Sequence, residues 1–153
     1  FGRAYAKSQI AAGQILPVEG RVFISVRNKD KRSIIFIAKK LVDLGFSLFA
    51  TSGTAKVLAK NGLAVERVFK ITEGRPNIAD MIKNGEIALI VNTPSGREAH
   101  TDQLSLRSLA VMYSVPYITT ISGAAAAVNG IEVLQKGELE VKPLQDYHTQ
   151  YRT

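Results

Sequence analysis

The chain has 153 residues, of which 46% are hydrophobic and 22% charged, a size and composition typical of one folded domain and not of a disordered segment. It contains no cysteine, which excludes a disulfide framework, a thiolate metal site and a cysteine nucleophile. The formal charge is +7, from 20 Lys and Arg against 13 Asp and Glu, so anions are the expected ligands.

The distribution of apolar and basic residues disfavours two classes of partner. No apolar run approaches the roughly 18 residues of a membrane-spanning helix, so we expect no membrane partner. The basic residues cluster only at 26–32, and the aromatic side chains lie elsewhere, which disfavours nucleic acid. A small anion is the expected ligand, and the lack of cysteine fits a cytoplasmic location.

The first 19 residues differ from the rest of the chain. The chain begins at Phe1 and its first methionine is Met81, so we expect a piece of a longer protein. Residues 1–19 join a helix-prone stretch to a linker that contains Pro17. We expect them to precede the domain proper.

From residue 20 onward, patterns typical of strands alternate with patterns typical of helices. Ile34, Ile37 and Leu41 recur at helical spacing, and Gly45 follows as a C-cap. In chain order, the prediction is a strand at 21–26, a helix at 30–45, a strand at 46–51, a helix at 54–61, a strand at 64–69, a helix at 75–86, a strand at 87–93, a helix at 101–114, a strand at 116–120 and a helix at 122–137.

Some element ends and the tail carry predictions of their own. Thr101 or Asp102 is the expected N-cap of the helix at 101–114. The last helix is expected to be interrupted at Asn129 and Gly130. A polar tail follows, with one extended segment at 138–141.

This alternation predicts an α/β domain with a parallel sheet and right-handed crossovers. Ligands of such sheets bind outside the carboxyl ends of the strands. Hydroxyls, amides, glycines and lysines predominate there, and carboxylates are nearly absent. The residues at these ends are Ser25, Lys31, Thr51, Ser52, Gly53, Thr54, Lys70, Asn92, Thr93, Ser95, Gly96, Thr119, Thr120 and Ser122.

The segment "TSGT" (51–54) is the strongest single indication of an anion site. It places a glycine and three hydroxyls at the start of a helix, where unpaired N–H groups and the helix dipole attract phosphate. The alternative is that Thr51 or Ser52 merely caps the helix. A second such segment, Ser95–Gly96 followed by Arg97, serves phosphate or forms an ordinary turn.

Catalytic residues are scarce. An exposed, structural role is expected for both histidines, His100 and His148, and no motif predicts a metal ion. Asp80 is expected on a solvated helix face, with a role as a base near phosphate as the alternative. Arg75, in the loop "EGRP", is expected to pair with Glu73, contact a ligand or contact a partner domain.

Several segments together resemble a known family. The segments "SVRNKDK", "ATSGTAKVLAKNG", "KITEGRPNIADMIKNGE", "IVNTPSGR" and "SVPYITTISGAAAAV" resemble the carboxy-terminal regulatory domain of carbamoyl-phosphate synthase large subunits. The resemblance implies the methylglyoxal-synthase-like fold, a three-layer sandwich around a five-stranded parallel sheet. It implies a regulatory domain at 20–142, preceded by the tail of a synthetase domain at 1–19 and followed by a tail at 143–153.

The resemblance also implies a role in allosteric regulation within arginine and pyrimidine biosynthesis. UMP would inhibit, IMP would share its site, and ornithine would activate from the boundary with the synthetase domain. The domain itself would need no cofactor or metal and perform no catalysis, while the whole enzyme would use ATP with Mg²⁺ or Mn²⁺ and a glutaminase small subunit. The implied nucleotide-site residues are Ser25, Lys31, Thr51, Gly53, Thr54, Lys70 and Asn92, and the implied ornithine contacts are Tyr117 and Thr119.

The sequence departs from the family pattern at two positions. Pro94 stands where enteric bacterial members have a threonine that helps to bind nucleotide, and Gln103 replaces a serine. We expect Ser95 to replace the lost hydroxyl. Two enzymes remain as alternatives: a methylglyoxal synthase-like lyase acting on dihydroxyacetone phosphate, and the less favoured cyclohydrolase of purine synthesis. The lyase family's Gly-Gly-Asp segment appears here as "EGRPNIAD", with Asp80 displaced along a helix.

Overall fold

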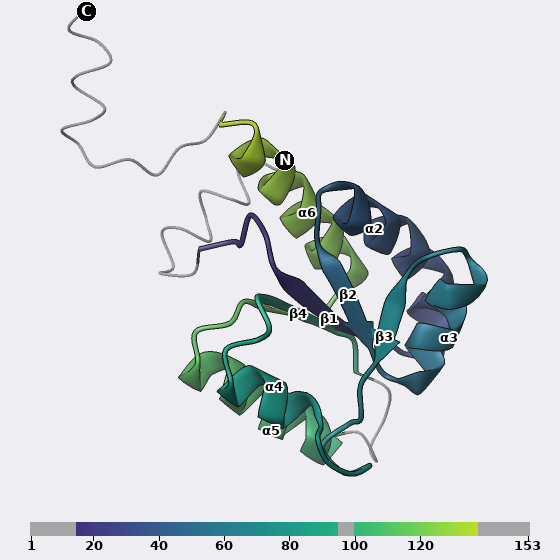
Figure 1. Ribbon diagram of the computed structural model, residues 1–153, viewed down its shortest axis with the longest axis vertical. Helices are drawn as coiled ribbons and strands as arrows, with labels where there is room; N and C mark the ends of the chain where they lie inside the picture. The colour runs from purple at the N-terminus through teal and green to yellow at the C-terminus, as the bar shows by residue number, and fades with distance from the viewer. Residues whose placement is uncertain (1–14, 95–99, 138–153) are drawn as a thin grey trace, which may run out of the picture.

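A five-stranded parallel sheet forms the centre of the structure, a computed structural model that describes residues 15–94 and 100–137 (Figure 1). Every neighbouring pair of strands is parallel, and the order across the sheet is β3-β2-β1-β4-β5. The strands are β1 (Arg21–Ser25), β2 (Ser47–Ala50), β3 (Val65–Arg67), β4 (Leu89–Asn92) and β5 (Tyr117–Ile118).

Helices cover both faces of this sheet, so the predicted three-layer α/β architecture is confirmed. Figure 1 shows α2, α3 and α6 on one face and α4 and α5 on the other. The helices are α2 (Lys31–Asp43), α3 (Ser52–Lys60), α4 (Ile78–Lys83), α5 (His100–Met112) and α6 (Ile121–Gln135), with a 3₁₀ turn, η1 (Asn28–Asp30), before α2. No helix within the described ranges is long and apolar enough to cross a membrane.

The hydrophobic core is divided between the two faces because successive strand residues point to opposite sides. In β1, Val22 and Ile24 pack in the cluster that includes residues of α2, α3 and α6. Phe23, between them, packs with residues of α4 and α5. The strands therefore read as continuous apolar runs, as expected of a parallel sheet buried on both faces.

The prediction that α6 breaks at Asn129 and Gly130 is wrong. The helix runs without interruption from Ile121 to Gln135. Gly130 is buried within it, and the Asn129 amide oxygen accepts a hydrogen bond from Lys40 of α2 at 2.9 Å. Packing along this helix outweighs the roughly 1 kcal/mol that glycine costs inside a helix.

Two other element ends differ from the prediction. Helix α5 begins at His100, so Thr101 and Asp102 lie within its first turn and not at its N-cap. Helix α4 is capped by Asn77, whose side chain accepts from the backbone N–H groups of Ala79 and Asp80. The predicted extended segment at 138–141 lies outside the described residues.

The end of the linker is attached to the domain. Leu16 is buried in the cluster that includes residues of α2 and α6. The Gln135 side-chain amide, at the end of α6, donates to the carbonyls of Val18 and Leu44, each at 2.8 Å. The predicted domain boundaries stay predictions.

The strand order determines where a ligand can bind. The chain runs outward from β1 to β2 and β3, and then returns to place β4 on the other side of β1. The carboxyl ends of β1 and β4 therefore flank the point where the strand order reverses, the usual location of ligands in such sheets. Ser25 and Asn92 are paired in register there.

Candidate functional site

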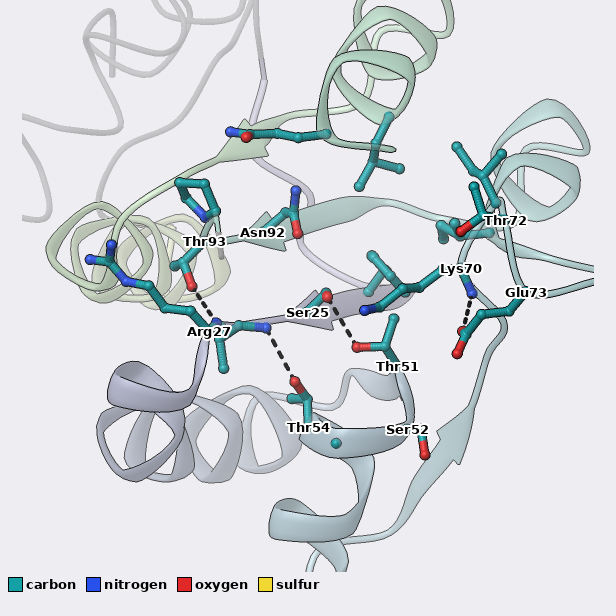
Figure 2. A pocket seen from close by; sticks show the side chains of 18 of the residues that line it. Ser25, Arg27, Thr51, Ser52, Thr54, Lys70, Thr72, Glu73, Asn92 and Thr93 are labelled. Atoms are coloured by element: carbon teal, nitrogen blue, oxygen red, sulfur yellow. Dashed lines mark hydrogen bonds between the residues drawn. The ribbon is translucent and has the colours of Figure 1, made fainter. Parts of the chain in front are cut away.

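A cavity of about 540 Å³ opens at the carboxyl ends of β1, β2 and β4 (Figure 2). Most of its polar side chains come from the loops that follow the strands. Phe23, Ile78 and Leu106 add an apolar wall from the α4 and α5 side. The other lining residues are Ser25, Val26, Arg27, Asn28, Lys31, Thr51, Ser52, Gly53, Thr54, Lys70, Ile71, Thr72, Glu73, Asn92, Thr93, Pro94 and Gln103.

The threonines of "TSGT" hold neighbouring strands together and leave the N-terminus of α3 without a side-chain cap. Thr51 occupies the N-cap position, yet its side chain accepts no hydrogen bond from the helix. Its hydroxyl donates to Ser25 Oγ at 3.0 Å instead. The Thr54 hydroxyl accepts from the backbone N–H of Val26 at 3.1 Å. The alternative of a simple hydroxyl cap is therefore wrong for Thr51, and the first turn of α3 presents its N–H groups to the cavity.

Lys31 lies beside this helix end and is held firmly in place. Its ammonium donates to the Val26 carbonyl at 3.0 Å and to Asn28 Oδ1 at 2.8 Å. A Cβ added to Gly53 would lie 3.3 Å from Lys31 Cε and 3.5 Å from Nζ. Glycine at this position therefore lets the lysine approach the helix end closely.

A second lysine increases the positive charge of the cavity. Figure 2 shows the Lys70 amine directed toward Ser25 and Thr51. Burial, and then the charge of Lys70, lower the pKa of Lys31. Two cations that repel each other across a cavity gain stability when an anion lies between them.

The other side of the cavity carries hydrogen-bonding groups of β4. Thr93 Oγ1 accepts from the backbone N–H of Arg27 at 2.9 Å, which ties β4 to the loop after β1. Asn92 Nδ2 donates to the hydroxyl of Tyr117 at 2.8 Å. Thr119 directly follows β5, is half-buried and does not line the cavity.

The structure brings together most of the residues that the sequence singled out for nucleotide. Seven of the eight lie in the lining of the one cavity: Ser25, Lys31, Thr51, Gly53, Thr54, Lys70 and Asn92. Ser95 lies outside the described residues. Their role in binding stays a prediction.

Sequence reasoning missed the contribution of the loop after β3. Ile71, Thr72 and Glu73 all line the cavity, and Glu73 Oε1 accepts from the backbone N–H of Lys70 at 2.7 Å. The polar composition of this loop was the one sequence signal that it could line a site. The apolar wall was also missed, because its side chains follow the same helical pattern as ordinary core residues.

Asp80 does not lie in this cavity. Its carboxylate accepts from the backbone N–H of Asn77 at 2.9 Å and pairs with Arg75 at 2.7 Å. The hydrogen bonds from Arg75 and Asn77 lower the pKa of this carboxyl, so it stays ionised. One expectation for Arg75 was an ion pair with Glu73. In the structure, Arg75 pairs with Asp80 instead.

Other catalytic or metal-binding groups do not converge within the described ranges. There, no three His, Cys, Asp or Glu side chains gather as they would around a metal ion. The imidazole of His100 and the whole of His148 lie outside the side chains that the structure describes.

Comparison with known proteins gives close relatives in sequence. The chain is 48% identical over 147 residues to the carbamoyl phosphate synthase large chain of Nostoc sp.. This alignment covers 96% of this chain and 13% of that relative. The corresponding protein of Myxococcus xanthus is 50% identical over 96% of this chain. That of Archaeoglobus fulgidus is 48% identical over 97% of this chain. The chain spans about one seventh of the length of these relatives.

A solved structure and a family model agree with the fold. The crystal structure of methylglyoxal synthase from Elizabethkingia anophelis aligns with a TM-score of 0.59 and 20% identity, over 74% of this chain and 79% of that one. This likeness shows the fold alone. The family model of the MGS-like domain matches residues 33–119, which carry β2 to β5 and much of the cavity. The chain belongs to the family of MGS-like domains.

Proposed function

We propose that this chain is a regulatory module of a carbamoyl-phosphate synthase large subunit, and that it binds a nucleoside monophosphate in the cavity at the ends of β1, β2 and β4. The similarity to large chains over nearly the whole of this chain supports the identity of the parent enzyme. The uncapped N-terminus of α3 between Lys31 and Lys70 supports the ligand class. This helix end is the single observation that carries the proposal, because it supplies both N–H donors and positive charge.

The effectors that we propose are UMP as an inhibitor, IMP at the same site and ornithine as an activator. The phosphate would bind the first turn of α3 and the two lysines. Tyr117 and Thr119, at the end of β5, would contribute to ornithine binding. In the cell, these effectors would report on pyrimidine and arginine biosynthesis in the cytoplasm.

The proposed partners of the module are the synthetase domains of the same subunit and a glutaminase small subunit. ATP with Mg²⁺ or Mn²⁺ would serve those synthetase domains and not the cavity described above. Binding at the cavity would change the contact between this module and its neighbour, a coupling of typically about 1–3 kcal/mol.

A regulatory role is favoured over lyase chemistry by the position of Asp80. Among the described residues that line the cavity, Glu73 is the one carboxylate, and it accepts the Lys70 backbone N–H. Asp80, the candidate base of the lyase alternative, is occupied in the cap of α4. Formation of methylglyoxal from dihydroxyacetone phosphate by the purified chain would contradict the regulatory role.

Calorimetric titration of the chain with UMP, IMP and ribose 5-phosphate tests the proposal. We expect all three to bind, and Lys70→Ala to weaken each by about tenfold, the effect of one charge-assisted hydrogen bond. Lys56→Ala is the matched control, since Lys56 is an exposed lysine of α3 that does not line the cavity. Absence of binding at millimolar ligand, or equal losses in both variants, would refute the proposed site.

A further inference from the structure

The two lysines of the cavity are held in different ways. The Lys31 ammonium donates to two protein acceptors, so it is fixed through its own side chain. The Lys70 ammonium bonds to no acceptor among the residues that the structure describes. Its place near Ser25 and Thr51 therefore depends on the backbone that carries it, the loop between β3 and α4 (Figure 2). We call residues 70–76 the Lys70 loop.

Backbone hydrogen bonds give the Lys70 loop a defined shape. At its base, Phe69 and Asn77 form a bridge, and the Ile78 N–H donates to the Phe69 carbonyl at 3.0 Å. Within the loop, Glu73 Oε1 accepts from the Lys70 N–H at 2.7 Å, and the Glu73 N–H donates to the Lys70 carbonyl at 3.1 Å. Lys70 thus belongs to a hydrogen-bonded turn, and the base of the loop ties that turn to the start of α4.

The Asn77 side chain joins the Lys70 loop to helix α4. Asn77 is buried, with 5% of its surface exposed. Its Nδ2 donates to the Gly74 carbonyl at 2.8 Å and to the Ile71 carbonyl at 3.4 Å. Its Oδ1 accepts from the backbone N–H groups of Ala79 and Asp80 in α4. These partners fix the orientation of the amide, because a carbonyl can only accept and a backbone N–H can only donate.

We propose that Asn77 is a positioning residue for the phosphate site: it holds the Lys70 loop on α4 and so keeps the Lys70 ammonium at the cavity. This inference rests on the proposed function and deepens it. A side chain without amide donors leaves the Gly74 and Ile71 carbonyls without this partner, and the loop gains conformations in which Lys70 lies away from the cavity. The apparent affinity for phosphate then falls with the fraction of chains whose lysine is in place.

Asn77→Ser separates this role from the capping of α4. Serine caps a helix about as well as asparagine, but it lacks the amide donors. In calorimetric titrations, we expect Asn77→Ser to weaken the binding of ribose 5-phosphate by about threefold to tenfold, up to the loss expected for Lys70→Ala. The matched control is Asn84→Ser, since Asn84 directly follows α4 and does not line the cavity. Its affinity should stay within about twofold of the parent.

A double-mutant cycle distinguishes positioning from a general loss of structure. Because Asn77 acts through Lys70, Asn77→Ser should cause no further loss of affinity when Lys70→Ala is already present. Equal losses with and without the Lys70 amine, or no loss in Asn77→Ser alone, would overturn the inference.

Hydrogen exchange gives a second measurement that does not depend on a ligand. In Asn77→Ser, the amides of the Lys70 loop should exchange faster than in the parent chain, while those of α2 should exchange at the same rate. Unchanged exchange in the loop would overturn the inference. Asn77→Asp, which also caps α4 and lacks the amide donors, repeats the test if the serine variant does not fold, with Asn84→Asp as the control for charge.

Ribose 5-phosphate separates failure of this inference from failure of the site. Binding that Lys70→Ala weakens and Asn77→Ser leaves unchanged would overturn the role of Asn77 alone. No binding of ribose 5-phosphate to the parent chain would overturn the proposed function, and this inference with it.

Discussion

Replacing Lys31 with methionine removes a cation that lies beside the N-terminus of α3 and keeps most of the length of the side chain. The ammonium already has two protein acceptors, at 3.0 Å and 2.8 Å, so it is fixed before any ligand arrives. A phosphate at the first turn of α3 would meet a preorganised charge, and ordering this side chain would cost little binding free energy.

The expected loss follows from the strength of such contacts. Two unit charges about 4 Å apart attract by roughly 4 kcal/mol at the effective dielectric constant of a protein surface. Hydrogen bonds to charged groups contribute about 1.5–3 kcal/mol after desolvation. We expect Lys31→Met to weaken UMP and ribose 5-phosphate alike, by about 10-fold to 150-fold.

The assay is isothermal titration calorimetry at low salt and at physiological salt, with circular dichroism to confirm that each variant is folded. Lys39→Met is the matched control, because Lys39 is an exposed residue of α2, the helix that begins at Lys31. Both substitutions change the net charge equally. A Lys31→Met affinity within twofold of the parent would refute the assignment of the phosphate to this end of α3. An equal loss in Lys39→Met would show that net charge alone attracts the ligand.

Three further outcomes are expected. The pKa of Lys31 in the free chain lies below its ordinary 10.5, and a bound phosphate favours the charged lysine. Phosphate affinity should therefore fall as pH rises through this pKa. In titrations from about pH 7 to 10, the decrease of affinity with pH should be smaller in Lys31→Met. Gly53→Ala should weaken the binding of ribose 5-phosphate severalfold, because the added methyl group displaces Lys31. The melting temperature should not fall, because alanine favours helix. An unchanged affinity would contradict this expectation. Asn77→Ala removes the α4 cap and should lower the free energy of unfolding in urea by about 1–2 kcal/mol, with Asn84→Ala as the milder control; equal losses would contradict the capping role.

The alternation of strands and helices was predictable because it depends on local apolar periodicity. Each predicted strand and helix is present, and the ends differ by a few residues. The shortest strands, β3 and β5, lie at the two edges of the sheet, where pairing with one neighbour decides their length. The continuity of α6 through Asn129 and Gly130 was not predictable, because burial against other elements decides it.

The sequence by itself determined which chemical groups stand at the strand ends. Hydroxyls, lysines and a glycine follow the strands, and this composition is enough to indicate an anion site. The parallel sheet followed from the same pattern, because the short connections and apolar strands leave few other arrangements.

Only the tertiary structure decided which of these groups meet. The return of the chain places β4 beside β1, so Asn92 and Ser25 share one cavity although 67 positions separate them in sequence (92 minus 25). The Thr51 hydroxyl bonds to Ser25 and not to its own helix, which leaves α3 uncapped. The Asn92 side-chain amide likewise donates to Tyr117 on the neighbouring strand β5. Local sequence carries no signal for such contacts, because they depend on the order of the strands and not on the residues next in the chain.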